Sequence, residues 1–382
     1  MTVSTAARLE QKPWGSARYQ VETLSDYGSF VGLEKAWSEL LERSGTWFPF
    51  ATHEWMRTWF EHFGDAARLN VLLVRVGRKL VGIAPLMLKK GWMYGVPVTS
   101  LQSIHNVYTE RYDFIIDGPA EEIYASIWEH LVRQDPRWDL LELRQLPAES
   151  ATLAHLTRLA ATDGLPAERW RSCESPYLAL HGSWEAYRLT LSAKTRCNLS
   201  SRRGRLQKTG SLDVEVIEKT DQAGPALAEG WVLEGAAWKD EAGTAVRCLP
   251  RVRAFYEAFA EAAARRGWLR LYFLRAGGRR IAFCYALCYH DRVFRLKSGY
   301  DPDYASCSPS TMLTALMIKE SLDRGLVQFE FLGGNDEWKH AWTRTAQAHE
   351  WMYIFRPGLR SSLIRWAKFR LAPALRGAGR AA

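Results

Sequence analysis

The chain has 382 residues, of which 47% are hydrophobic and 24% are charged. This composition excludes a wholly disordered chain, and the length is sufficient for two ordinary domains. The formal net charge of +9 favours an anionic partner, such as a phosphorylated cofactor, nucleic acid or an anionic membrane face.

The N-terminal stretch and the cysteines indicate the cellular compartment. Residues 1–20 contain no apolar core stretch, so we expect no signal peptide. Because no run of about 18 apolar residues occurs, we also expect no membrane span. The six cysteines lack close metal-type spacing, which predicts free thiols in a reducing compartment and no metal site. We therefore predict a cytoplasmic protein.

The first half of the chain predicts helices and strands in a definite order. Aromatic residues recur at helical spacing in residues 50–64, where Gly64 is a natural stop. Residues 69–91 then read as two apolar strands around a turn that contains Gly77. The remaining predicted elements are a strand at 113–117, a helix at 121–135 and a strand at 138–147.

The second half repeats this order. Its predicted elements are a helix at 252–267, three strands within 268–300, a helix at 308–325 and a strand at 326–334. The repetition predicts two copies of one α/β unit, with mixed sheets and helices on both faces. The predicted segments are an N-terminal arm at 1–28, a first unit at 29–170, a connecting segment with a basic helix at 171–210, a second unit at 211–355 and a basic amphipathic tail at 356–382.

Two segments carry many basic side chains and no acidic ones. In residues 191–210, Arg202, Arg203 and further lysines and arginines surround a seam of leucines at helical spacing. This helix suits a nucleotide-sugar diphosphate, a lipid-linked phosphate or tRNA, whereas the alternative is a solvated charged face. The absence of interleaved aromatic residues argues against single-stranded nucleic acid, so we do not expect nucleic acid as a partner. The tail at 360–380 predicts a helix that lies peripherally on the anionic inner face of a membrane, or else a docking helix or a frayed end.

A strand end and a helix start lie close together in the second half. Pro309 suits the first turn of a helix, and Ser308 is a natural N-cap. Such a helix start can receive a pyrophosphate, although a well-capped helix is the simpler alternative. Lys297 is predicted on the strand face opposite Phe294 and Leu296, where it could reach a phosphate or remain an exposed lysine.

Polar and aromatic side chains crowd behind the last predicted strand of the second unit. Glu330 and Asp336 are candidate proton acceptors by their position at the strand end. Lys339 is predicted to anchor an anionic or carbonyl group. Trp338 and Trp342, which are four residues apart, are predicted to share one helix face and to form a pocket wall.

The order and spacing of several motifs resemble one acyltransferase family, the GNAT enzymes. The motifs are PFATHEWMRTWFEHFG (49–64), LVGIAPL (80–86), WKDEAGTAV (238–246), GGRRIAF (277–283), LKSGYDPDYASCSPSTML (296–313) and FEFLGGNDEWKHAW (329–342). The doubled arrangement is similar to the BcsL/CelD-type acetyltransferases of bacterial polysaccharide loci. More distantly, it resembles the Fem-type aminoacyl-tRNA-dependent peptidyltransferases. The resemblance covers roughly residues 30–345.

This resemblance implies a tandem duplicated GNAT-like fold and an acyltransferase. The expected donor is acetyl-CoA or another acyl-CoA. The expected acceptor is an amine or hydroxyl of a sugar, a nucleotide-sugar or a lipid-linked envelope or exopolysaccharide precursor. Direct transfer needs positioned reactants and a route for the proton, without a covalent nucleophile. Two other interpretations stay open: a Fem-like aminoacyl-tRNA-dependent transferase, and an inactive GNAT-like scaffold of a polysaccharide-synthesis complex.

The resemblance also implies roles for named residues. Those expected to bind the acyl-CoA are Lys297, Ser308, Pro309, Ser310 and Thr311. The family's loop usually reads Ser-Pro-Gly, so Ser310 departs from the pattern. Tyr304 is expected to protonate the leaving thiolate. Those expected to bind the acceptor are Trp238, Lys239, Arg202, Arg203, Trp338, Tyr108 and Asp113, with Arg111 as a neighbour. Acidic residues begin the corresponding helix of the first unit, so we expect one cofactor site, in the second unit.

Overall fold

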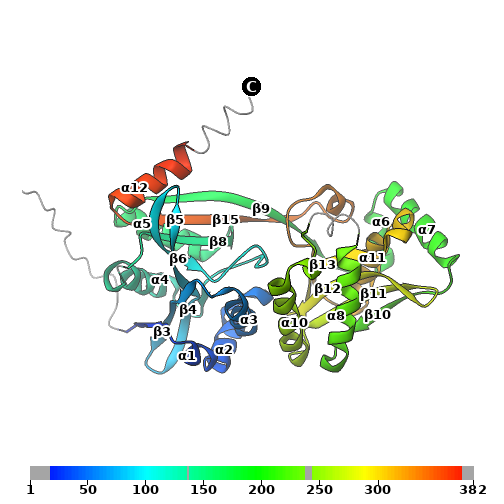
Figure 1. Cartoon of the computed structure of the whole chain (residues 1–382), viewed down its shortest axis with the longest axis horizontal. Helices are drawn as coiled ribbons and strands as arrows, with labels where there is room; N and C mark the ends of the chain where they lie inside the picture. The colour runs from blue at the N-terminus through cyan, green and yellow to red at the C-terminus, as the bar shows by residue number, and fades with distance from the viewer. Residues whose placement is uncertain (1–17, 136, 237–242, 372–382) are drawn as a thin grey trace, which may run out of the picture.

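The computed structural model describes residues 18–135, 137–236 and 243–371. Figure 1 shows two lobes, each built from strands and covering helices, which confirms the predicted mixed α/β class. The helices of the first lobe are α1 (Tyr27–Val31), α2 (Glu34–Ser44), α3 (His53–Phe63), α4 (Ala120–Glu129) and α5 (Ala151–Thr162). The helices that follow in the sequence are α6 (Trp184–Thr190), α7 (Ala193–Gln207), α8 (Thr220–Gly235), α10 (Pro250–Arg265), α11 (Pro309–Asp323) and α12 (Leu359–Trp366). Short 3-10 or π turns are η1 (Pro49–Ala51), η2 (His130–Gln134), η3 (Val246–Cys248), η4 (Pro302–Cys307), η5 (Glu337–Ala341) and η6 (Ala367–Leu371).

Within the described residues, the strands form a sheet of four and a sheet of eleven. The smaller sheet has the order β1 (Gln20–Leu24), β3 (Val71–Val76), β4 (Lys79–Ala84), β7 (Ile115–Ile116). The larger has the order β10 (Leu212–Ile217), β11 (Leu269–Ala276), β12 (Arg279–Tyr289), β13 (Arg292–Tyr300), β14 (Gln328–Glu330), β9 (Ala167–Ala179), β15 (Ala346–Phe355), β8 (Leu140–Pro147), β6 (Val96–Ser103), β5 (Leu86–Met93), β2 (Ala67–Leu69). The larger sheet therefore runs through both lobes.

The predicted hairpin at residues 69–91 is confirmed in its first part only. β3 and β4 pair around Gly77, whose φ of 58° is one that glycine adopts easily. Pro85 follows β4, and β5 then pairs with β6 in the larger sheet. Proline lacks the N–H that a continuing ladder needs, which explains why one apolar run supplies strands to two sheets.

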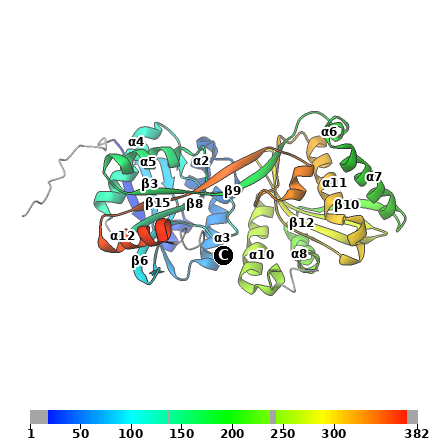
Figure 2. The ribbon, with the colours of Figure 1, turned by 90° about the horizontal axis from the view of Figure 1, so that it is seen from above.

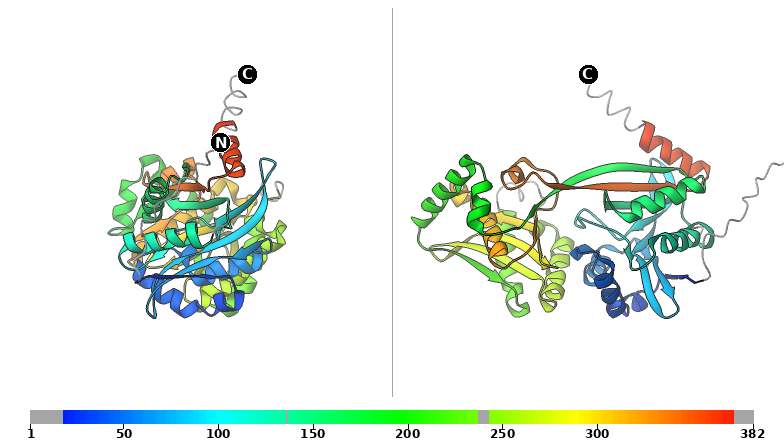
Figure 3. Two further views of the ribbon diagram at one scale, coloured as in Figure 1. Left: turned by 90° about the vertical axis from the view of Figure 1, so that its left-hand side faces the viewer. Right: turned by 180° about the vertical axis from the view of Figure 1, so that it is seen from behind.

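Two long strands, β9 and β15, join the lobes. β9 pairs with β15 over most of its length and with β14 at its end, so one strand serves both halves of the sheet. Figures 2 and 3 show β9 and β15 side by side as they cross between the lobes. Residues 346–355 were predicted to belong to the second unit, but β15 pairs with β8 of the first. The alternating pattern of a strand does not specify which neighbouring strand it pairs with. The predicted limit of the second unit at residue 355 is therefore corrected only by the strand pairing in the structure.

The lobes also share one hydrophobic core. Trp55 of α3 packs edge-on against Phe255 and Phe259 of α10, with ring centroids 5.1 and 4.8 Å apart. Thr52 caps α3 by accepting a hydrogen bond from the Trp55 N–H, which fixes where that helix begins. Aromatic edge-to-face contacts of this kind add to the burial of apolar surface. The residues near this contact are therefore held in a defined position relative to both lobes.

The strands β13 and β14 pair over three residues only. The parallel register runs from Arg292–Phe294 to Gln328–Glu330, and β13 then continues to Tyr300. Beyond the paired residues, the backbone of β13 lies against α8 instead. A Cβ on Gly299 would lie 2.1 Å from the Leu233 carbonyl oxygen, so glycine is needed for this close approach. The candidate site lies where β13 and β14 separate.

The described part of the predicted basic tail, residues 356–371, forms α12 and the turn η6, and residues 372–382 lie outside the described structure. Ile364 and Ala367 are buried, and Ile364 packs in a small cluster with Tyr353 and Phe355 of β15. The inner face of the helix is therefore docked on the sheet. Among the described residues, no helix has the length and apolar character needed to cross a membrane.

Candidate functional site

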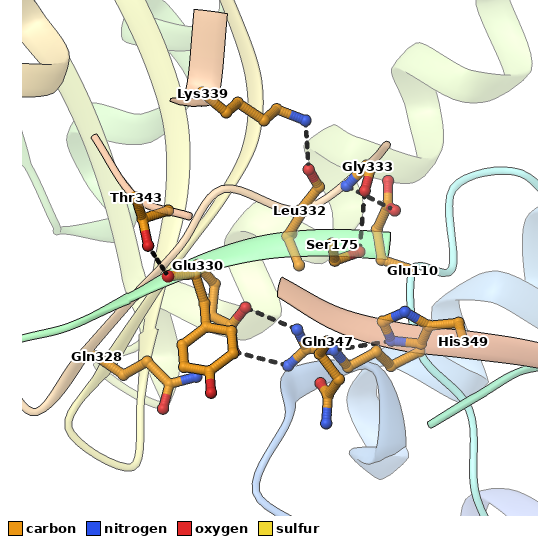
Figure 4. A network of polar contacts seen from close by, with 12 residues as sticks. Glu110, Ser175, Gln328, Glu330, Leu332, Gly333, Lys339, Thr343, Gln347 and His349 are labelled. Atoms are coloured by element: carbon orange, nitrogen blue, oxygen red, sulfur yellow. Dashed lines mark hydrogen bonds and ion pairs between the residues drawn. The ribbon is translucent and has the colours of Figure 1, made fainter. Parts of the chain in front are cut away.

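A strained turn follows β14. Leu332 and Gly333 have φ of 54° and 61°, a left-handed region that leucine rarely adopts. The buried Lys339 donates to Leu332 O at 2.7 Å, and Ser175 of β9 donates to Gly333 O at 2.9 Å (Figure 4). Lys339 also donates to Gly334 O at 2.6 Å. These hydrogen bonds hold a backbone conformation that is intrinsically unfavourable.

The same turn positions Glu110 of the first unit. The Gly333 N–H donates to Glu110 Oε2 at 3.1 Å (Figure 4). Burial raises the pKa of the Glu110 carboxyl, while the Gly333 hydrogen bond and the charges of Lys297 and Lys339 oppose that rise. A carboxylate with a raised pKa is a stronger base than an ordinary glutamate, so Glu110 is a candidate proton acceptor.

Lys297 lies beside aromatic rings from both units. Its ammonium is 5.0 Å from the ring centroid of Tyr108 and 5.4 Å from that of Tyr256. The prediction that Lys297 faces away from Phe294 and Leu296 was wrong, because all of them border the core cluster that contains Tyr256. The β12–β13 register shifts within this stretch, and such a bulge interrupts strict alternation.

A buried ion pair joins the two units next to the turn. Arg111 donates to both oxygens of Glu330, at 2.8 and 2.6 Å, and both side chains are almost fully buried. The Arg111 Nε donates to His349 Nε2 at 3.3 Å. Burial, with the nearby Arg111, lowers the pKa of His349 to about 3, so the imidazole is a neutral acceptor. Gln328 also donates to Glu330 at 2.7 Å, and Figure 4 shows Gln328, Glu330 and His349 in the same network.

The predicted catalytic residues at the end of β14 make contacts within the protein. Glu330 is bound by Arg111, and it therefore joins the units instead of facing an acceptor. Lys339 holds the turn after β14 and pairs with the exposed Asp336 at 2.9 Å. The structure thus places Lys339 as a residue that positions the turn, in contrast to the predicted anchor for an acceptor.

The prediction that Trp338 and Trp342 share a helix face was wrong. They lie on and just after η5, a 3-10 helix with three residues per turn, so residues four apart do not align. Trp342 is buried in the cluster around α11, whereas Trp338 is 43% exposed. The guanidinium of Arg295 lies 5.0 Å from the Trp338 ring centroid, and Phe331 of the α11 cluster packs edge-on against the same ring. Trp338 and Arg295 are therefore on the α11 side of the sheet.

The helix α11 begins at Pro309, as predicted. Ser308 occupies the N-cap position with a φ of 46°, but in the described structure its side chain makes no capping hydrogen bond. Its carbonyl accepts the Thr311 N–H at 3.0 Å. Ser310 lies inside the helix, so its replacement of the usual glycine requires no left-handed conformation there.

Tyr304 lies on η4, immediately before α11. The Arg279 guanidinium is 5.9 Å from its ring centroid and donates to Asp301 at 2.6 Å. Arg279, Asp301 and Pro302 line a pocket of about 700 Å³ that extends toward α8. Tyr304 is therefore next to the loop that is predicted to bind phosphate.

The predicted acceptor residues do not form one cluster. Tyr108 is at the Lys297 site, but Asp113 accepts hydrogen bonds from Ser150 and Thr152 at the start of α5. Burial raises the pKa of Asp113 to about 6, and its side chain lines a second pocket, of about 620 Å³. Arg202 and Arg203 lie on the predicted basic helix, α7, of which Leu199 and Leu206 are buried as expected. Trp238 and Lys239 lie outside the described residues.

Three residues near the turn were absent from the predicted site: Glu110, Tyr256 and His349. Glu110 was accessible to sequence reasoning, because it lies in the polar segment NVYTERYDF, from which Tyr108 and Asp113 were selected. Glu110 is singled out in the structure by the hydrogen bond from the Gly333 N–H, and Gly333 is 223 positions away in the chain. No local pattern predicts such a contact.

A substitution of Lys339 tests whether this residue holds the turn in place or takes part in the reaction itself. We expect Lys339→Met to lower the free energy of unfolding by about 1.5–3 kcal/mol, because two charge-assisted hydrogen bonds to carbonyls are lost. Activity should fall in parallel, since the turn orients Glu110. Urea unfolding and steady-state kinetics of the same variant test this. Full stability with a large loss of kcat would instead assign Lys339 to the reaction.

Part of the chain matches a known protein family. Residues 193–340 match the family model described as an acetyltransferase (GNAT) domain. This match covers most of the second unit and shows its similarity to GNAT-type acetyltransferase domains. The match extends from α7 into η5, and it therefore includes β13, α11, β14 and the strained turn. A comparison with curated proteins finds no match.

Solved structures resemble the whole described fold, beyond the GNAT domain. The crystal structure of FemX aligns with a TM-score of 0.60 at 10% identity, over 91% of this chain and 99% of that one. L-PGS from Bacillus licheniformis aligns with a TM-score of 0.52 at 12% identity, over 87% and 94%. A conserved protein of unknown function from Bacteroides thetaiotaomicron gives 0.51 at 11%, over 88% and 100%. At such identities the similarity shows the fold alone.

Proposed function

We propose that the protein transfers an acyl group from acyl-CoA to an amine or hydroxyl of an acceptor bound between its two units. The observation that carries this proposal is the position of Glu110 at the turn where β13 and β14 diverge inside a GNAT domain. The acceptor N–H or O–H attacks the acyl carbonyl, the C–S bond breaks, and Glu110 takes the acceptor proton. The leaving thiolate takes up a proton in turn.

The different side chains on the two faces of the sheet support a separate position for each proposed substrate. Arg295 and Trp338 lie on the α11 side, the face covered by the helix whose start is predicted to receive a pyrophosphate. Glu110 and Lys297 lie on the α10 side, where Tyr256 packs. We therefore place acyl-CoA on the α11 side and the acceptor on the α10 side.

The acceptor class is a sugar or a lipid-linked envelope or exopolysaccharide precursor. Tyr108, a half-buried ring beside Lys297, offers an amphipathic surface of the kind that supports sugar rings. Lys297 supplies a positive charge that suits a nucleotide or lipid-linked phosphate. The polysaccharide context itself rests on the resemblance to BcsL/CelD-type proteins.

Calorimetry with acetyl-CoA, followed by mass spectrometry of acceptor mixtures, tests the proposal. We expect acetyl-CoA to bind and an acceptor to gain the acyl mass in the presence of protein. Absence of binding for every acyl-CoA tried would contradict the donor. Binding without turnover across a broad acceptor screen would favour the inactive scaffold.

One observation favours an aminoacyl-tRNA donor as the second candidate. Lys194, Arg203, Arg205 and Lys208 are exposed on or at the end of α7, and no acidic side chain among the described residues pairs with them. An exposed basic helix can bind the nucleic acid backbone. A gel-shift assay with charged tRNA distinguishes an aminoacyl-tRNA donor from an acyl-CoA donor. A salt-sensitive shift would support the tRNA donor if the double variant Arg203→Ala/Arg205→Ala weakens it.

A further inference from the structure

The outer face of α12 is apolar, although its inner face is already docked. Leu359 is 92% exposed, Leu363 is 50% exposed and Trp366 is 53% exposed. Their spacing of four and then three residues places them on one side of the helix. Arg360 and Arg370 are also exposed on this segment. The helix therefore presents an apolar strip with basic neighbours to the surroundings.

A second element with the same chemistry lies beside it. The β5–β6 hairpin turns at Tyr94 and Gly95, whose φ of 52° and 77° fit a tight two-residue turn. This turn holds the Tyr94 ring at the tip, and Trp92 is 76% exposed, the most exposed of the aromatic side chains in the described structure. Lys89 and Lys90 on β5 are exposed as well.

The hairpin and α12 form one surface. Trp92 and Arg360 line the same shallow pocket, of about 380 Å³, together with Lys90 and Pro97. α12 packs on β6, the partner strand of β5 in this hairpin, and Figure 1 shows β5 and α12 near each other at the top of the first lobe. Of the nearby acids, Asp139 accepts the Thr99 N–H and Glu168 pairs with Arg365. The surface therefore keeps a net positive charge around its exposed aromatic rings.

We propose that the tip of the β5–β6 hairpin and the outer face of α12 bind together to an anionic phospholipid bilayer. Tryptophan and tyrosine favour the interface between headgroups and acyl chains, and apolar helix faces insert to a shallow depth. Lysine and arginine next to them add attraction to anionic headgroups. This surface holds the protein peripherally on the inner face of a membrane, where lipid-linked precursors are. The proposed membrane binding depends neither on the identity of the acyl donor nor on the role of Glu110.

Co-sedimentation with vesicles tests the proposal. The full chain should bind vesicles of phosphatidylcholine with 30% phosphatidylglycerol, and it should bind pure phosphatidylcholine at least about tenfold more weakly. We expect Trp92→Ala to weaken binding at least about fivefold, as should Trp366→Ala, because each removes an interfacial ring. Arg360→Glu should weaken vesicle binding by a similar factor, and the binding that is left should depend less on salt concentration.

Leu363→Ala should weaken vesicle binding as well, and Leu189→Ala is its matched control, since Leu189 is an exposed leucine on α6 of the connecting segment. The control should bind vesicles normally, and circular dichroism should show all variants folded. Equal binding to both vesicle types would overturn the proposal, as would unchanged binding of Trp92→Ala. A dimer seen by light scattering and lost in Trp92→Ala, without vesicle binding, would assign the surface to a second copy of the chain.

Discussion

Glu110→Gln should lower kcat by a factor of about 100 to 10,000, with a much smaller change in KM, because the amide cannot accept the acceptor proton. The amide keeps the size of the side chain and can still accept the Gly333 N–H, so the turn should persist. Steady-state kinetics with acetyl-CoA, together with a melting curve, measure both effects. A variant that retains more than half of the wild-type kcat would remove Glu110 from the reaction.

The pH profile of the same reaction gives a second readout. Glu110 must be deprotonated to act, and burial raises its pKa, so the acidic limb of kcat/KM should lie above the ordinary glutamate range. Lys297 lowers that pKa through its charge. Lys297→Met should therefore move the limb to still higher pH. Glu149→Gln makes the same chemical change at an exposed carboxylate of the same unit, and it should leave the profile unchanged.

Arg111→Met should lower the free energy of unfolding by about 3–5 kcal/mol, the largest stability effect that we expect for a single side chain. The substitution leaves the Glu330 carboxylate fully buried without its cation, and it removes the donor to His349. Urea unfolding monitored by tryptophan fluorescence measures the loss. Because the pair joins the two units, the variant should also lose activity.

A double substitution and an exposed pair serve as controls. Arg111→Met/Glu330→Gln should recover part of the stability, because no unpaired charge then stays buried. Arg57→Met removes an exposed partner of Glu61 and should change stability by at most about 1 kcal/mol. If Arg111→Met were as mild as Arg57→Met, the Arg111–Glu330 pair would contribute little to joining the units.

Much of the fold was predictable because it depends on local patterns. Apolar residues at helical spacing predicted α3, α10 and α11, and Pro309 marked the start of α11. Alternating strands around Gly77 and Gly277 predicted both hairpins. These features arise from backbone preferences and the burial of one face, which act over a few residues.

The candidate site was less predictable because its contacts join distant parts of the chain. Glu330 was predicted as a proton acceptor from its place at a strand end, yet Arg111 of the other unit neutralises it. Lys297 was assigned to the wrong strand face because a bulge is not visible in an alternating pattern. Trp338 and Trp342 were separated by a 3-10 turn where an α-helix was expected.

The sequence by itself indicated the α/β class, the helices α3, α10 and α11, the hairpins around Gly77 and Gly277 and the motifs at residues 296–313 and 329–342, since each is encoded by neighbouring residues. Only the tertiary structure decided that β15 completes the sheet of the first unit and that Gly333 meets Glu110. It also brought Trp92 beside Arg360. Strand pairing and buried charge complementarity depend on which surfaces meet after folding, and a linear pattern does not contain that information.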